Sequence, residues 1–118
     1  MQKTELERRV AKKRQLALFR LNDPDDPGSG YASLGTVREF IDQLAPFNTA
    51  PDGSPPRQTG TEVLHGPGIV IEYASNQDEV RQAILTVVDQ DVAWPVLSRL
   101  CKTLCWKMQD LESGQVFG

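Results

Sequence analysis

Residues 82–111 carry a strand pattern, a helix pattern and a second strand pattern in direct succession. Gln82–Val88 (QAILTVV) is apolar at consecutive positions and rich in β-branched residues, as expected for a strand that is buried on both faces. Asp91–Cys105 then repeats apolar residues at helical spacing, and Trp106–Leu111 (WKMQDL) alternates apolar and polar residues, which is typical of a half-buried strand. A right-handed crossover of this kind would make the two strands parallel and place the helix against the sheet.

Two more structural segments precede this unit. Thr36 and Glu39 have the spacing of a capping box before an apolar face that ends at Pro46, so they predict a helix. Glu62–Leu64 and Gly68–Ala74 are rich in strand-forming residues. The pattern predicts an α+β fold with two layers, in which a small mixed sheet of three to four strands has helices packed on one face.

The N-terminal region predicts a helix ahead of this fold. Leu6, Val10, Ala17 and Leu21 recur near helical spacing within Thr4–Leu21. We therefore divide the chain into a basic helical arm at 1–21, a linker at 22–33 and a single α+β domain at 34–118. A mobile loop at 50–60, rich in Pro, Gly and Ser, interrupts that domain.

Charge is unevenly distributed along the 118 residues. Residues 1–20 hold seven basic and two acidic side chains, a net charge of +5, whereas the rest holds six basic and fourteen acidic side chains, a net charge of −8. The basic residues Arg8, Arg9, Lys12 and Lys13 suggest an anionic partner such as nucleic acid. The acidic remainder would repel a polyanion, and no aromatic residue stands among the basic ones to stack on bases. Contact with the chain's own acidic body, or simple exposure of these residues to solvent, therefore ranks ahead.

Four carboxylates are candidates for a site. If the strands around the last helix are parallel, their C-terminal ends bring Asp89, Asp91, Asp110 and Glu112 to one edge of the sheet. Such an edge could bind a divalent cation and support a metal-dependent enzyme or a metal-binding protein. Helix capping and turn formation explain the same residues without a ligand and rank ahead of the metal site.

The remaining polar motifs favour structural roles. His65 has no second histidine and no nucleophile motif beside it, and the glycine pairs at 28–30 and 66–68 lack the lysine and helix of a phosphate-binding loop. Cys101 and Cys105 lie four residues apart in one predicted helix and are interpreted as buried hydrophobic residues. No cofactor is predicted.

The tryptophans carry the leading functional hypothesis, which is a non-enzymatic protein that binds a protein partner or a second copy of itself. Trp94 and Trp106 are of a residue type that is enriched at interfaces. Because each borders an apolar stripe, burial in the core is the alternative. No apolar run approaches the ~20 residues of a membrane span, and the N-terminus lacks the pattern of a secretory signal, so the expected location is the cytoplasm.

The C-terminal third resembles the ends of certain small bacterial proteins without a known activity. The resemblance lies in VVDQDVAWPVLSRLCKTLCWKMQDLESGQVF, and particularly in Asp110, Ser113 and Gly114, where an acidic residue and a Ser-Gly turn follow a strand, a helix and a strand. It implies a bacterial origin and carries no activity over to this chain.

Overall fold

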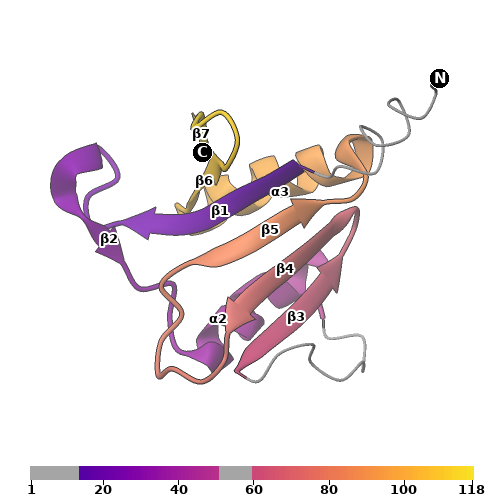
Figure 1. Ribbon diagram of the computed structural model, residues 1–118, viewed down its shortest axis with the longest axis horizontal. Helices are drawn as coiled ribbons and strands as arrows, with labels where there is room; N and C mark the ends of the chain where they lie inside the picture. The colour runs from indigo at the N-terminus through magenta and orange to yellow at the C-terminus, as the bar shows by residue number, and fades with distance from the viewer. Residues whose placement is uncertain (1–13, 51–59) are drawn as a thin grey trace.

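The computed structural model describes residues 14–50 and 60–118, which form a seven-stranded antiparallel sheet and two α-helices (Figure 1). Six strands follow the order β3-β4-β5-β1-β6-β7, and β2 pairs with β1 beside this path. The strands are β1 (Arg14–Leu21), β2 (Tyr31–Ala32), β3 (Thr61–Gly66), β4 (Ile69–Ala74), β5 (Ala83–Val87), β6 (Lys107–Asp110) and β7 (Val116–Phe117). The helices are α2 (Val37–Leu44) and α3 (Gln90–Leu104), with short 3-10 turns η1 (Pro27–Ser29) and η2 (Ala45–Phe47).

The predicted fold class was wrong in two respects. The sheet has seven strands and every pairing is antiparallel, in place of a small mixed sheet of three or four strands. Arg14–Leu21, assigned to an N-terminal helix, forms β1 between β5 and β6. The run Leu16–Phe19 is buried throughout. Leu16 and Leu18 belong to the core beneath the helices, and Ala17 and Phe19 lie on the opposite face of the sheet.

Two other predicted segments lie partly outside the described residues. Residues 1–13 of the predicted arm and residues 51–59 of the predicted mobile loop fall there. Residues 22–30, within the predicted linker, connect β1 to β2 as a closed loop, in which Asn22 N–H donates to the Gly30 carbonyl at 2.8 Å. Leu21 at the end of β1 pairs with Tyr31 of β2 across this loop.

The capping box of the first helix is confirmed. Thr36 accepts a hydrogen bond from the backbone of Glu39, and the Glu39 carboxylate accepts one from the backbone of Thr36, at 3.1 and 2.9 Å. The predicted stop also holds, since α2 ends at Leu44 and continues only as the 3-10 turn that contains Pro46. α2 thereby places Phe40 and Leu44 in the core.

The β5–α3–β6 unit has the order that the sequence predicted, but β1 lies between its two strands. β5 and β6 each pair antiparallel with β1, so they run in the same direction. Asp89 caps α3 and Cys105 ends it in a left-handed conformation with φ of 59°. Because β5 and β6 run in the same direction, both end at the same edge of the sheet.

Gly68 determines how closely the β3–β4 turn approaches the start of α3. Its carbonyl accepts hydrogen bonds from the backbone of Val88 and Asp89 at 2.7 and 3.1 Å. Its φ is +68°, and a Cβ atom there would lie 2.6 Å from the Asp89 carbonyl oxygen. Only glycine tolerates both the positive φ and this contact.

Both helices lie on one face of the sheet (Figure 1). Alternate residues of the strands point toward them, and Phe40 of α2 contacts Tyr73 and Trp106 with ring centroids 5.0 and 5.9 Å apart. This layer contains the core, whose largest fully buried side chains are Trp106, Phe40, Leu16, Leu18, Leu34, Leu44, Leu64, Ile69, Ile71, Leu85, Leu97 and Leu100. The opposite face of the sheet has no helix over it among the described residues.

Candidate functional site

The strand ends that the sequence predicted to share an edge do share it, because β5 and β6 run in the same direction. The side chains of Asp89 and Asp110 at this edge make hydrogen bonds within the fold. Asp89 is the N-cap of α3 and accepts from the backbone N–H of Val92 at 3.4 Å, while Asp91 lies in the first turn of that helix. Both positions are favourable beside the positive end of a helix. Among the described histidine, cysteine, aspartate and glutamate residues, no group of three or more is placed to hold a metal ion.

The carboxylate of Asp110 accepts hydrogen bonds from the turn that follows it and from Arg14 at the start of β1. One carboxylate oxygen accepts from the backbone N–H groups of Glu112 and Ser113 at 2.8 and 3.0 Å. The other accepts from Arg14 Nε at 2.7 Å. The hydrogen bond from Ser113, with those from Arg14 and Glu112, lowers the pKa of Asp110 from 3.8 to about 2, because each favours the charged form. This carboxylate joins β1 to the end of β6.

Arg14 also connects this edge to two aromatic rings. Its guanidinium carbon lies 5.3 Å from the ring centroid of Trp94 and 5.2 Å from that of Phe117. The two rings meet edge to face at 5.1 Å. Trp94 is thus half-buried within a contact between α3, β1 and β7, where a cation over an aromatic face is stabilising.

Of the other residues proposed for interactions, one is buried and four lie outside the described residues. Trp106 is 1% exposed and stacks on Phe40, which is the core position that the sequence left open as an alternative. Arg8, Arg9, Lys12 and Lys13 lie outside the described residues. Of the two cysteines, Cys101 is buried, which raises the pKa of its thiol to about 11, and Cys105 is exposed.

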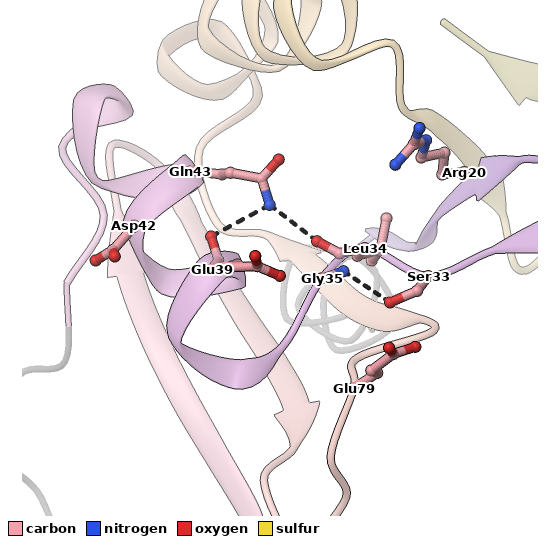
Figure 2. Close-up of a pocket in the computed structure, with 8 residues that line it drawn as sticks. All are labelled: Arg20, Ser33, Leu34, Gly35, Glu39, Asp42, Gln43 and Glu79. Atoms are coloured by element: carbon pink, nitrogen blue, oxygen red, sulfur yellow. Dashed lines mark hydrogen bonds between the residues drawn. The ribbon is translucent and has the colours of Figure 1, made fainter.

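A polar hollow of about 540 Å³ lies between the end of β1 and α2 (Figure 2). It is lined by Arg20, Ser33, Leu34, Gly35, Glu39, Asp42, Gln43 and Glu79. Most of these groups hold the loop that leads into α2. Gln43 Nε2 donates to the carbonyls of Leu34 and Glu39 at 2.9 and 3.2 Å, and Gly35 N–H donates to Ser33 Oγ at 2.8 Å.

The carboxylates of the hollow have their own partners. Glu39 belongs to the capping box, Asp42 lies 3.6 Å from Arg38, and Glu79 lies 3.7 Å from Arg81. Their oxygens stabilise the start and the exposed surface of α2 and the loop before β5. The hollow is therefore a polar junction between the loop and the helix.

The sheet face opposite the helices is a further surface of the described residues, and we call it the open face. Its members follow from strand alternation and register, because every second residue points away from the helices. Those on β3, β4, β5 and β6, and on the part of β1 that pairs with β5 and β6, are Gln15, Ala17, Phe19, Thr61, Val63, His65, Val70, Glu72, Ala74, Ile84, Thr86, Lys107 and Gln109. Ala17 and Phe19 are buried, Gln15 is exposed, and the others are half-buried.

The centre of the open face is apolar. Ile84 lies between Glu72 and Ala17 in the register of the sheet, and Val63 and Val70 lie on the next strands outward. Phe19 contacts Tyr31 of β2 at a centroid distance of 5.1 Å. The sequence pattern did not indicate this surface, because the consecutive apolar residues of Gln82–Val88 predict a strand buried on both sides. The half-exposed positions Ile84 and Thr86 show that β5 has one open side.

The two outer edges of the sheet are short or partly covered. Ala50 exchanges backbone hydrogen bonds with His65 of β3 at 2.9 and 2.7 Å, on the side of β3 away from β4. At the other edge, β7 has only two residues. Natural proteins use both devices to prevent pairing between edges, so the open face is the better candidate for an interaction.

No helix of the described residues has the length and the apolar character needed to cross a membrane. Comparison of the chain with protein-family models, with curated protein sequences and with solved structures gave no match in any of the three.

Proposed function

We propose that this protein is a self-associating module, whose open face packs against the open face of a second copy. The observation that carries the proposal is the position of both helices on one side of a seven-stranded sheet, which leaves the other side half-exposed around an apolar centre (Figure 1). Sheets bury apolar faces against another layer, and two such faces pack about 10 Å apart.

The size of the open face suits a weak and reversible dimer. Five strands at ~4.8 Å spacing and five residues at ~3.3 Å rise give roughly 400 Å² in projection. With the relief of the side chains, two copies would bury roughly 1,000 Å² in total, at the lower limit of specific interfaces. We expect a dissociation constant in roughly the micromolar range and dimerisation that depends on concentration.

The chemistry of the open face is also suitable. Thr61, Thr86, Gln15 and Gln109 surround the apolar centre, which resembles the polar rim of an interface. Trp94, part of the sequence-based interaction hypothesis, lies on the helical side against Phe117 and takes no part in this surface.

Sedimentation velocity from about 1 μM to about 1 mM tests the proposal, since this range spans the expected dissociation constant. The expected result is a shift from monomer to dimer. Ile84→Lys on the open face should abolish that shift, because it places a charge in the buried centre. Val92→Lys is the matched control, since Val92 is 46% exposed on α3 in the helical layer.

Two results would contradict the proposal. One is a wild-type protein that stays monomeric at the highest concentration, and the other is a Val92→Lys variant that loses dimerisation as completely as Ile84→Lys. The second result would move the contact to the helical layer. Melting curves of both variants establish that each is folded before its mass is compared.

A further inference from the structure

Glu72 has unusual neighbours on the open face. It lies in the middle of β4, directly opposite Val63 on β3 and Ile84 on β5. Along its own strand, the neighbours on the same face are Val70 and Ala74. Within residues 14–50 and 60–118, its half-buried carboxylate makes no hydrogen bond and no ion pair. A single acidic group therefore lies inside the apolar centre.

A carboxylate at this position restricts what can cover the face. Burial of an unpaired carboxylate under a second apolar layer would cost several kcal/mol. The covering surface must therefore bring a cation or a hydrogen-bond donor to Glu72. The open face itself has both at its far side, since Lys107 and Gln109 lie on β6.

The register of the sheet fixes where these groups lie. Glu72, Ile84, Ala17 and Gln109 are aligned in one row across β4, β5, β1 and β6. Lys107 is two residues from Gln109 on the same strand, and so about 6.6 Å away along it. Its Nζ donates to the Gly118 carbonyl at 3.0 Å in an exposed hydrogen bond, which the side chain can exchange for another acceptor at little cost.

Two symmetric ways of packing open faces differ at Glu72. In the first, the two-fold axis runs parallel to the strands and passes between β5 and β1, the middle of the six-strand order. Each row of residues across the sheet then faces the same row of the second copy, and β4 stacks on β6 of that copy. Glu72 then faces Gln109 and the reach of Lys107. A two-fold axis along the row itself stacks β4 on its own copy, and Glu72 then faces Glu72, which is unfavourable for two carboxylates.

We propose that Glu72 selects the first arrangement by pairing with Lys107 and Gln109 of the second copy. This inference rests on the proposed self-association. It adds the orientation of the two copies and the residues that determine it. A charged residue in an otherwise apolar interface commonly fixes register at a cost in affinity, and Glu72 fits that role.

A charge exchange tests the pairing by sedimentation equilibrium. Glu72→Lys alone and Lys107→Glu alone should each weaken dimerisation by roughly tenfold or more, because each places like charges opposite each other. The double variant should recover a dissociation constant within roughly threefold of the wild type. Glu62→Lys is the matched control, since Glu62 is exposed on the helix side of the neighbouring strand β3 and undergoes the same change of charge.

Glu72→Gln separates the two arrangements even if a charge reversal fails to fold. It should weaken the dimer in the first arrangement, where an ion pair is lost, and strengthen it in the second, where repulsion is lost. A stronger Glu72→Gln dimer, or a double variant without recovery, would overturn the pairing while self-association stands. A wild-type protein that is monomeric throughout would instead overturn the proposed function on which the pairing rests.

Discussion

Truncation of Leu18 to alanine tests whether Arg14–Leu21 is a central strand. Leu18 is fully buried in β1, opposite Ala83 of β5 and Met108 of β6. Leu→Ala removes three buried side-chain carbons, each of which contributes ~0.8 kcal/mol of hydrophobic stabilisation, and it leaves a cavity. We expect a loss of about 3 kcal/mol in the free energy of unfolding.

Thermal unfolding followed by circular dichroism gives a second measure of the same change. The unfolding entropy of 118 residues is about 0.25 kcal/mol/K, so a loss of about 3 kcal/mol lowers Tm by about 12 °C. Leu111→Ala is the control, because Leu111 is 51% exposed after β6, and its truncation should cost less than about 0.5 kcal/mol. A loss below about 1 kcal/mol for Leu18→Ala would refute the central position of β1, since a weakly packed N-terminal helix would predict such a small value.

Two further predictions concern Asp110 and Cys105. The pKa of Asp110 in the folded protein, about 2, lies below its ordinary value of 3.8, so the ionised carboxylate stabilises the fold above pH ~4 and this contribution is lost as the pH falls toward 2. The stability difference between wild type and Asp110→Asn in urea unfolding should therefore be largest at neutral pH and shrink between about pH 4 and pH 2; a difference that is independent of pH would contradict this explanation. Cys105 ends α3 at a φ of 59°. Because glycine adopts this conformation without strain, Cys105→Gly should raise the free energy of unfolding by about 0.5 kcal/mol or more. A lower stability in urea unfolding would show instead that the packing of the thiol outweighs the strain.

The sequence by itself determined the segments whose local signals agree with their environment. The capping box of Thr36 and Glu39 located the start of α2, and helical spacing located α3 to within a residue or two. β5 and β6 were each indicated as a strand, whereas β3 and β4 were indicated only as strand-forming residues on either side of a break at Gly66–Gly68. These signals are local, because they depend on backbone capping and on the periodicity of one element.

Only the tertiary structure decided the place of β1 and the character of the open face. Leu16–Phe19 has no alternation, because all four of its side chains are buried, and the apolar spacing around it suggested a helix. The same four-residue apolar run was the available signal for a buried strand. Pairing with β5 and β6, which lie more than sixty residues away in the chain, is what selects the strand conformation.

The same distinction between local signals and tertiary structure applies to the candidate site. The sequence correctly indicated that the ends of β5 and β6 share an edge, but it could not show that Asp110 is occupied by Arg14 and by its own turn. It also could not place Glu72 opposite Val63 and Ile84, because register across strands is set by pairing between distant segments. Local periodicity thus determined most of the elements, and long-range strand pairing determined which side chains meet, because a strand acquires its neighbours only when the whole sheet is assembled.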